Sequence, residues 1–495
     1  KGYENLLLQS NSFLTTWTNF LIDTPTSGQA GYDGTNNAWL IECINTSNFN
    51  GVRQSISTTG VTTLSVYAKA GTTNFLGFFS SAGFGGFELI GAGTTGQLFG
   101  NAIDSKIELI SNGWYRCSIV LNGNVSAVFI GARSSINSFN ANIGDSIYIQ
   151  DAMLNQGLVA YPYIETTTAP VAGGILEDMP RLDWASGAPS LLLEPSRTNL
   201  ANHSELISSQ VPRYMNSIVD VTYTPCYGIS PEGAKNSTRV QFADTTAFAY
   251  KAVSLSEDNT GSLYVKGTAG EDIRFGFGTT VAQGGVIHTF DGTWQRITHT
   301  SSTGVQFYLS SYTYTGNQAL DFEIYGLQHE IGSYPTSYIP TYGVSQTRLA
   351  EDVELPSLSS VFDSTGSFTL FFEIERLSSS VQQQILYIRG LGYFRLDATA
   401  DNRLKFVIYG GGASVSEANS GVNTFVAGTS SKIIYKQNGT IGQCFVNGQE
   451  ITNVNPTILT GFFTFYQRNE NHIKHKEVYF PTALSDEECI QLTTV

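Results

Sequence analysis

The chain is short of charged residues and of methionine. Asp, Glu, Lys and Arg make up 14% of its 495 residues, and it has three methionines. Helical proteins are rich in Ala, Glu, Lys and Leu, so this composition disfavours a chiefly helical fold. Glycine and aromatic residues are plentiful instead, with 50 glycines and an aromatic fraction of 12%. The composition predicts an all-β protein, and the length suits about three domains of roughly 100 to 200 residues each.

Basic clusters and long apolar runs are also missing from the sequence. The formal net charge is −15, and the acidic residues are spread along the chain without a basic stretch to oppose them. Nucleic acids and anionic membranes are therefore poor partners. Apolar stretches such as Thr460–Phe465 are far below the roughly 20 residues that a membrane helix needs, so we expect no membrane insertion.

The cysteines do not form a recognisable site. The five are far apart, odd in number and never in a CxxC arrangement: Cys43, Cys117, Cys226, Cys444 and Cys489. This pattern disfavours zinc sites and a disulfide framework, and predicts folding in a reducing cytoplasm. The sequence opens at Lys1 without methionine, and the apolar start is too short for a signal peptide. Either a leading segment precedes Lys1 or the numbering begins inside a longer product.

Catalytic signatures are absent from the sequence as well. It has no GxSxG elbow, no HExxH and no P-loop. Gly91–Gly96 fits GxGxxG, but no helix signal follows it, so it predicts a hairpin loop. On a strand, His472 and His475 would face opposite sides, which disfavours a metal site. Carboxylate pairs such as Glu257-Asp258 lie in turn-forming stretches, so we expect no enzyme.

An internal repeat is the most informative feature that is present. Tyr-Ile-x-Thr begins at Tyr163 and again at Tyr338, at the end of stretches that match at an offset of 175. Further back, Ser65–Lys69 matches Ser262–Lys266, and Trp114-Tyr-Arg matches Trp294-Gln-Arg. The offset drifts between these anchors because loops vary in length more than strands do. A repeat of this length indicates two copies of one module.

Apolar and polar residues alternate between Gly, Asn and Thr clusters, which predicts half-buried antiparallel strands and a β-sandwich. The fold class expected is therefore all-β, with tandem β-sandwich domains, two of them related repeats. The expected divisions are module 1 at 1–166, a Pro/Gly-rich connector at 167–197, module 2 at 198–345 and a C-terminal domain at 346–495. The prolines of the connector disfavour central strands there.

The C-terminal domain lacks the repeat anchors but is equally rich in strand signals. Its Asn447-Gly448 supplies the positive φ of a tight hairpin turn. A short helix is expected over Ser485–Leu492, where Ser485 as N-cap and Glu488 three residues later form a capping box.

Two segments of the sequence resemble those of a known group of proteins. The run Pro180–Leu200, followed by a module that closes in Gly332–Thr341, resembles bacteriophage tail-fibre and virion surface proteins with carbohydrate-binding-module-like jelly rolls. The match covers both modules and the connector. Module 1 departs from it, with Glu165 where module 2 has Pro340. The C-terminal domain resembles the concanavalin A-like, or laminin-G-like, family in its central hairpin and its closing strand and helix.

The resemblance implies a role on a virion. We expect a structural protein of a tail fibre, head fibre or decoration, assembled in the host bacterial cytoplasm and displayed on the virion surface. Its partners would be other virion proteins and host-surface glycans, which it would bind as an adhesin. Family resemblance implies a homotrimer, whose multivalent display would strengthen weak single sites. No heptad run shows the trimer in the sequence itself.

Exposed aromatic rings flanked by Asn, Asp or Gln are the residues that bind sugars on β-sandwiches, because a sugar's apolar face stacks on a ring. Five residues have such surroundings and are the candidate glycan-binding positions: Tyr312, Tyr314, Tyr32, Trp39 and Tyr409. Core or rim packing is the competing interpretation for each. Trp114 and Trp294, at matching positions within strands, are expected in the core.

No cofactor is expected, although structural calcium stays open, since the resembled families often hold it in loops. Asp145 and Asp321 precede the last strands of the two modules, where turn capping is the alternative. Two other functions also stay open. One is a purely structural decoration protein without a glycan ligand. The other is a polysaccharide depolymerase, which would need a carboxylate pair facing a cleft.

Overall fold

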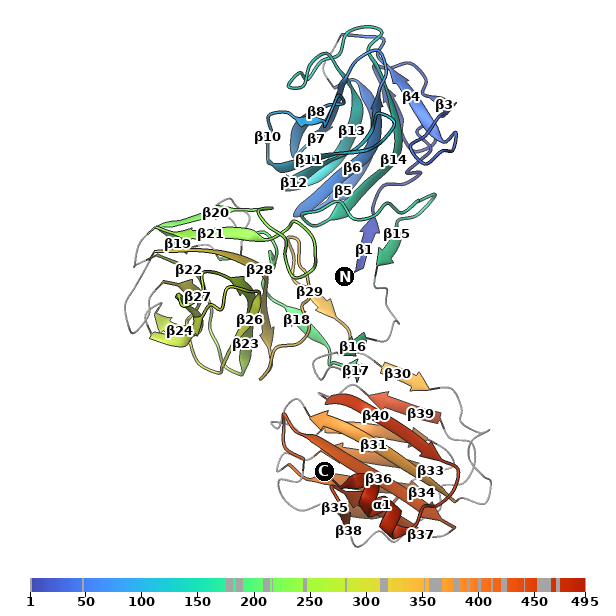
Figure 1. The fold of residues 1–495 in the computed structure, drawn as a ribbon, viewed down its shortest axis with the longest axis vertical. Coiled ribbons are helices and arrows are strands. Elements are labelled where there is room, and N and C mark those ends of the chain that lie inside the picture. Colours follow the sequence, from blue (N-terminus) through green and yellow to red (C-terminus); the bar gives the residue numbers. More distant parts are fainter. Residues whose placement is uncertain are drawn as a thin grey trace. The chain divides into compact units, whose positions relative to one another are not determined.

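The computed structural model describes most of modules 1 and 2 and a smaller share of the C-terminal domain. The described residues are 2–46, 49–174, 181–183, 190–207, 214–215, 217–243, 247–280, 283–311, 319–350, 352–355, 367–376, 383–389, 392–398, 402–410, 413–419, 425–439, 441–451, 464–468 and 472–494. They contain strands and one helix, in several separate sheets. The prediction of an all-β protein built from tandem sandwiches is confirmed (Figure 1).

Module 1 is a sandwich of two antiparallel sheets. The first, in spatial order, comprises β11 (Ala102–Ser111), β12 (Trp114–Asn122), β6 (Val61–Ala70), β14 (Ser146–Gln156), β4 (Ala38–Glu42) and β3 (Thr26–Gln29). The second comprises β10 (Phe99–Gly100), β8 (Gly83–Glu88), β7 (Phe75–Ser80), β13 (Val125–Arg133), β5 (Gly51–Thr58) and β2 (Thr18–Phe20), with β9 (Thr94–Thr95) paired to β8. Buried aliphatic and aromatic side chains such as Leu64, Phe78 and Ile147 fill the space between them.

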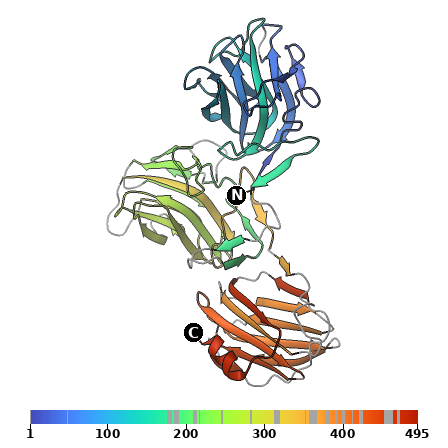
Figure 2. The ribbon, with the colours of Figure 1, turned by 45° about the vertical axis from the view of Figure 1, so that its right-hand side comes forward.

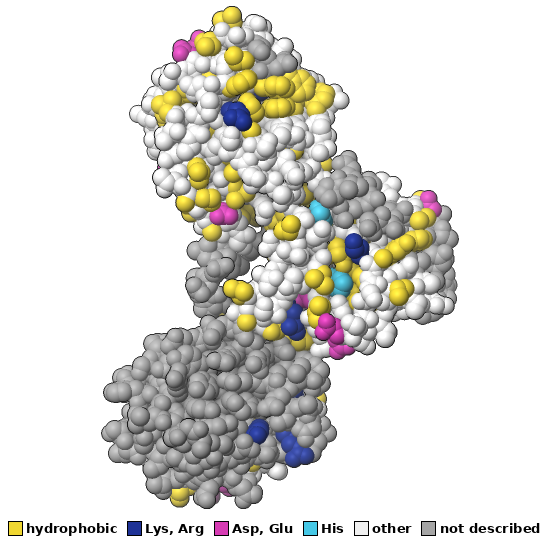
Figure 3. Space-filling view, turned by 180° about the vertical axis from the view of Figure 1, so that it is seen from behind, with side chains coloured by type: hydrophobic (Ala, Val, Ile, Leu, Met, Phe, Trp, Pro, Cys, Tyr) yellow, Lys and Arg dark blue, Asp and Glu magenta, His cyan; other side chains and the backbone are white. Residues whose placement is uncertain are grey.

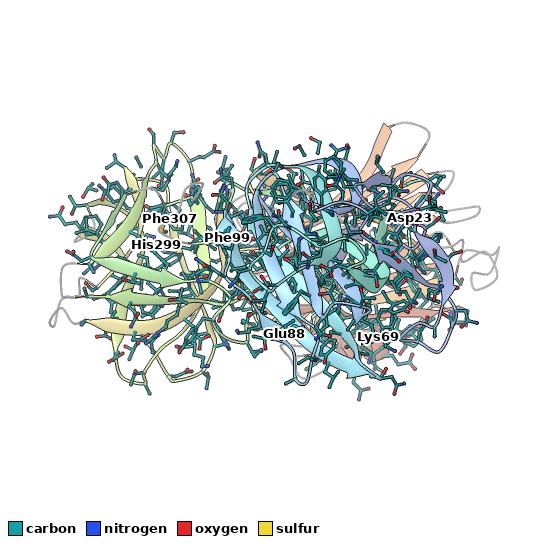
Figure 4. All side chains as sticks on the ribbon, turned by 90° about the horizontal axis from the view of Figure 1, so that it is seen from above. Asp23, Lys69, Glu88, Phe99, His299 and Phe307 are labelled. Atoms are coloured by element: carbon teal, nitrogen blue, oxygen red, sulfur yellow. The ribbon has the colours of Figure 1, made fainter. Side chains whose placement is uncertain are left out.

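Module 2 repeats this topology. Its first sheet comprises β26 (Gln295–Ser301), β23 (Asn259–Lys266), β28 (Leu320–Ile331), β21 (Thr238–Phe242) and β20 (Val221–Thr224). Its second comprises β25 (Gln283–Thr289), β24 (Asp272–Thr280), β27 (Gln306–Ser310), β22 (Phe248–Ala252) and β19 (Ser217–Val219). Strand for strand, β20, β21, β23, β26 and β28 take the places of β3, β4, β6, β12 and β14. Phe307 lies inside this sandwich and packs on Phe277, with His299 close by (Figure 4).

The C-terminal domain also has two sheets. The first comprises β16 (Arg181–Asp183), β17 (Ser190–Leu193), β40 (His472–Phe480), β31 (Phe368–Arg376), β36 (Ser430–Asn438), β37 (Ile441–Val446) and β38 (Gln449–Ile451). The second comprises β30 (Asp352–Leu355), β39 (Thr464–Arg468), β32 (Gln383–Arg389), β33 (Gly392–Ala398), β34 (Leu404–Gly410) and β35 (Ala413–Asn419). Figure 2 shows the strands of this domain with the helix α1 (Asp486–Thr493) beside them.

Part of the proline-rich connector forms strands, in contrast to the sequence-based expectation. β17 lies between β16 and β40, because the run Leu191–Leu193 falls between Pro189 and Pro195 and itself contains no proline. Two further pairs of strands are β1 (Gly2–Asn5) with β15 (Val171–Gly174), and β18 (Arg197–Asn199) with β29 (Gln346–Arg348).

Two local predictions in the C-terminal domain are confirmed. Asn447 and Gly448 have φ values of 50° and 79°, as a tight hairpin turn between β37 and β38 requires. In the capping box of α1, the Glu488 amide donates to the Ser485 hydroxyl at 3.2 Å, and the Ser485 amide donates to the Glu488 carboxylate at 2.8 Å. No helix among the described residues is long and apolar enough to cross a membrane.

A buried asparagine explains the start of the repeat in module 1. Asn5 is fully buried, and its amide donates to the carbonyl oxygens of Ala152 and Ile164 at 3.2 and 2.8 Å. Its side-chain oxygen accepts from the amides of Leu7 and Leu154, both at 3.2 Å. One side chain thus ties the N-terminal segment to the last strand and to the closing Tyr-Ile-x-Thr motif.

Asn199 forms the same four bonds in module 2. Its amide donates to the carbonyl oxygens of Leu327 and Ile339 at 3.1 and 2.8 Å. Its oxygen accepts from the amides of Ala201 and His329 at 3.0 and 3.1 Å. Since every donor and acceptor of the buried amide is used, the site specifies an asparagine at this position.

The tyrosine of the closing motif is also bound in the same way in both modules. The Tyr163 hydroxyl lies 2.7 Å from that of Ser10, and the Tyr338 hydroxyl lies 2.6 Å from that of Ser204. The Ser10 and Ser204 hydroxyls in turn accept from the motif's threonine amides at 2.9 and 2.8 Å. The repeated sequence signature is therefore the bond set that closes each sandwich.

Candidate functional site

The outer face of the first sheet of module 2 carries alternating charges. On β21, Val240 and Phe242 point into the core, so Arg239 and Gln241 point outward. On β28, the core residues Phe322 and Ile324 leave Asp321 and Glu323 on the outer face by the same two-residue period.

The strand register brings these charges together. Arg239 lies opposite Glu323, and Gln241 lies opposite Asp321. Arg239 reaches diagonally to Asp321, with its Nε 2.8 Å from Oδ1 and its Nη2 bonded to Oδ2. The Arg239 guanidinium holds the pKa of the Asp321 carboxyl below its usual value, and the Asp321 bond raises the pKa of Arg239. Both groups are therefore charged at neutral pH.

A second ion pair lies beside the first. Lys266, at the end of β23, places its Nζ 3.3 Å from Oε1 of Glu323. The other carboxylate oxygen of Glu323 accepts from the Ser237 hydroxyl at 2.6 Å. The Lys266 side chain is 40% exposed and that of Glu323 is 15% exposed, so the lysine faces the solvent while its partner is held in place.

Two aromatic rings flank the ion pairs. Tyr227 is 45% exposed, and the Arg239 guanidinium lies 5.2 Å from its ring centroid. The Trp294 ring has the Lys266 ammonium 6.0 Å from its centroid and donates its indole N–H to the carbonyl of Ile229 at 3.1 Å. Trp294 is half-buried, so the expectation that it belongs to the core is wrong.

Two adjoining depressions of about 460 Å³ each lie at the ion pairs and Tyr227 and share Thr268 and Asp321, whereas Trp294 is not among the residues that line them. One is lined mainly by the ends of β21 and β28, and the other by both ion pairs and Tyr227. We call the two together the module-2 groove, with Tyr227, Arg239, Lys266, Asp321 and Glu323 as its defining residues. It offers a ring face, paired donors and paired acceptors on a rigid sheet.

The five aromatic positions singled out in the sequence lie elsewhere. Tyr312 and Tyr314 are outside the described residues, and so is the side chain of Tyr409, whose backbone lies in β34. Trp39 packs edge-on against Phe13 at the rim of the module 1 core and donates its N–H to a backbone carbonyl at 3.1 Å.

Tyr32 is half-buried on module 1. Its ring stacks on that of Tyr67 with centroids 3.8 Å apart and an interplanar angle of 8°. Its hydroxyl donates to Oδ2 of Asp151 at 2.7 Å. Burial, followed by this hydrogen bond, raises the pKa of Tyr32 above its usual value. Asp151 in turn is only 7% exposed.

The buried Asp151 is expected to make the stability of module 1 depend on pH. Burial raises the pKa of its carboxyl to about 6 from an ordinary value of 3.8. Between these values the folded protein binds more protons than the unfolded chain, so the free energy of unfolding falls as pH rises from about 4 to about 6. Above about pH 6 the buried carboxylate lowers the free energy of unfolding by an amount that no longer changes with pH.

Asp151→Asn is therefore expected to stabilise module 1 at pH 8 by about 1 to 2 kcal/mol and to give no gain at pH 3.5. The φ of 56° at this position suits asparagine as well as aspartate. Chemical denaturation of both proteins at the two pH values measures the effect. An equal shift at both pH values would contradict the burial account.

The two aspartates considered for calcium have different surroundings. Asp145 caps a turn, since its Oδ2 accepts from the Asn142 amide at 2.7 Å. Asp321 pairs with Arg239, which the sequence did not indicate. Gly91–Gly93 lie in the hairpin loop between β8 and β9, as expected, and the rest of Gly91–Gly96 contains β9 itself.

Of the residues that define the groove, Asp321 alone was a candidate position in the sequence, and there as a calcium ligand. The available signal was the alternation of charged and apolar residues in Thr238–Phe242 and Asp321–Tyr325, two segments about 80 residues apart whose pairing only the fold reveals.

No family model and no curated protein matches the chain. Among solved structures, CBM40 of the Ruminococcus gnavus IT-sialidase, with α2,3-sialyllactose bound, is similar at 13% identity; the match covers 29% of this chain and 96% of that one, with a TM-score of 0.24. The Caenorhabditis elegans galectin LEC-6 is similar at 18% identity, over 26% and 89%, with a TM-score of 0.22. Domains LG4-5 of the mouse laminin α1 chain are similar at 9% identity, over 49% and 89%, with a TM-score of 0.21.

Proposed function

We propose that the chain is a non-enzymatic, glycan-binding protein of a phage virion surface, and that the module-2 groove holds the glycan. The observation that carries this is the exposed ring of Tyr227 beside the Arg239–Asp321 pair. A sugar would stack its apolar face on the ring, while adjacent hydroxyls accept from the guanidinium and donate to the carboxylate.

The charge balance of the groove favours neutral sugars. Arg239 is paired with Asp321, and Lys266 is paired with Glu323, so these four groups sum to zero, and Glu271 adds one further carboxylate to the lining of the groove. A ligand carboxylate would have to displace a protein carboxylate from a cation, and it would face the second carboxylate nearby. Hydroxyl groups use both members of each pair without separating them.

The wider surface is consistent with neutral ligands. On the face that Figure 3 shows, charged side chains of the described residues are few and lie among hydrophobic and other uncharged atoms. Display in several copies on a fibre or decoration, as a trimer, would raise the avidity of weak sites.

A glycan array tests this function. The full chain is expected to bind neutral hexopyranose oligosaccharides and to bind sialylated or uronate-containing ones no better than their neutral parents. A preference for acidic glycans would contradict the charge argument, and an array without signal would contradict glycan binding.

One observation favours the alternative of a structural decoration protein. On the second sheet of module 1, Phe49 stacks on Phe79 at 3.8 Å, and both contact Phe129, next to the 40% exposed Phe20. Phe49, Phe79 and Phe129 are half-buried, and partly exposed apolar clusters of this kind are typical of protein interfaces. Phe20→Ser tests this alternative by light scattering and by the glycan array. If the variant dissociates the oligomer and still binds on the array, the cluster serves assembly.

A further inference from the structure

Both modules carry the same aromatic and basic residues on the outer face of their first sheet. In module 1, Tyr67 on β6 lies opposite Arg116 on β12, whose guanidinium is 5.6 Å from the Tyr67 ring centroid. In module 2, Tyr264 on β23 lies opposite Arg296 on β26, at 5.5 Å. The repeat therefore preserves a ring and its cation at equivalent places, on faces that point away from each core.

A tryptophan stands two residues before each arginine. In module 1, Trp114 lies opposite Lys69 on β6. In module 2, Trp294 has Lys266 over its ring and lies beside the module-2 groove. Module 1 thus has the tyrosine, tryptophan and arginine that module 2 carries on the same face, although in module 2 these three residues do not line the groove.

The loop that follows β3 or β20 differs between the modules. Tyr32 stands three residues after the end of β3, and Tyr227 stands three residues after the end of β20. Tyr227 lies under Arg239 and is 45% exposed. Tyr32 instead lies flat on Tyr67, with its edge toward Trp114 at 6.3 Å between centroids.

This difference decides which tryptophan is accessible. Trp114 is 2% exposed beneath Tyr32, whereas Trp294 is half-buried. The loop of Tyr32 is held close to β14, because its amide donates to Oε1 of Gln150 at 3.3 Å and its hydroxyl donates to Asp151 at 2.7 Å. A Cβ added to Gly31 would come within 2.3 Å of that Gln150 oxygen, so a larger residue there would require the Gln150 side chain to move.

We propose that module 1 holds a second glycan-stacking site, formed by Tyr67, Trp114 and Arg116, which the Tyr32 ring occupies in place of a sugar. The proposal rests on the function proposed for module 2 and extends it to its repeat. The stacked Tyr32 ring covers the face of Tyr67 on which the apolar face of a pyranose would lie. Asp151, which accepts from the Tyr32 hydroxyl, is placed to accept from a sugar hydroxyl once the ring is removed.

The ligand class is the same as for the groove. Arg116 and Lys69 supply donors, and Asp151 supplies an acceptor, around an aromatic floor. This combination suits a neutral pyranose that stacks through its apolar face. In the wild-type chain the site is closed, so module 2 alone binds.

The test is the number of glycans bound per full-length chain, measured by calorimetric titration with the neutral oligosaccharide that gives the strongest array signal. Tyr32→Ala removes the covering ring and is expected to add one site per chain, with an affinity of its own, because the floor of Tyr67, Trp114 and Arg116 differs from the Tyr227 ring of the groove. Tyr32→Phe keeps the ring and is expected to add none. In a Tyr227→Ala background, Tyr32→Ala is expected to restore binding through module 1.

Tyr32→Leu guards against a folding failure of the alanine variant. It keeps apolar contact with Trp114 but is too short to cover Tyr67, so a weaker additional site is expected. Unchanged stoichiometry in folded Tyr32→Ala or Tyr32→Leu chains, while the wild type binds, would overturn the second site and leave the proposed function intact. Binding by Tyr32→Ala when the wild type gives no array signal would support the second site and overturn the groove. No binding by either would overturn both.

Discussion

Tyr227→Ala is expected to lower the affinity of the full chain for its neutral glycan by about ten-fold or more, the effect of losing a central aromatic contact. The ring supplies the stacking surface, and it lies against the Arg239 guanidinium, whose position depends on it. Removing it therefore weakens both the apolar contact and the hydrogen-bonding geometry. Calorimetric titration of both proteins measures the change.

Two matched variants separate this effect from a general disturbance. Tyr227→Phe keeps the ring and is expected to retain most of the affinity. Tyr250→Ala removes a tyrosine from β22, in the other sheet of the same module, and is expected to leave binding unchanged. Equal losses in Tyr227→Ala and Tyr250→Ala would argue against the groove as the site.

Asn199→Ala is expected to destabilise module 2 by about 3 kcal/mol or more, because it leaves two carbonyls and two amides of a buried site without their partner. The amide is fully buried and makes four hydrogen bonds. Chemical denaturation of the full chain measures the loss of stability. Hydrogen exchange of the amides in β28 shows that the loss lies in this module. Asn5→Ala is expected to have the same effect on module 1, reported by β14.

Asn236→Ala is the control. Asn236 is equally buried, but neither of its amide atoms has a hydrogen-bond partner among the described residues. Its replacement removes no bond and relieves an unpaired polar group, so the loss is expected to be clearly smaller. If Asn199→Ala lowers the free energy of unfolding no more than Asn236→Ala does, the four hydrogen bonds of Asn199 do not stabilise the closed sandwich.

The fold could be predicted from the sequence because the patterns that indicate it are local or occur twice along the chain. Period-2 alternation predicted the strands, and the recurrence of Tyr-Ile-x-Thr predicted two copies of one module. The structure adds the physical reason for that recurrence, since Asn5 and Asn199 bond to the carbonyls of Ile164 and Ile339 within the two motifs.

The module-2 groove could not be predicted from local or repeated patterns. Arg239 and Asp321 are 82 residues apart, and only the pairing of β21 with β28 brings them together. Trp294 matches Trp114 in sequence, yet its exposure depends on where a loop residue lies. Tyr32 covers Trp114, while Tyr227 leaves Trp294 half-buried, and no local pattern distinguishes the two arrangements.

The most direct test of glycan binding by the module-2 groove is hydrogen exchange of the full chain with and without the neutral oligosaccharide. Protection is expected in the segments that line the groove, around Tyr227, along β21, at the end of β23 and at the start of β28. Binding that protects other segments and leaves these unchanged would contradict the assignment of the site.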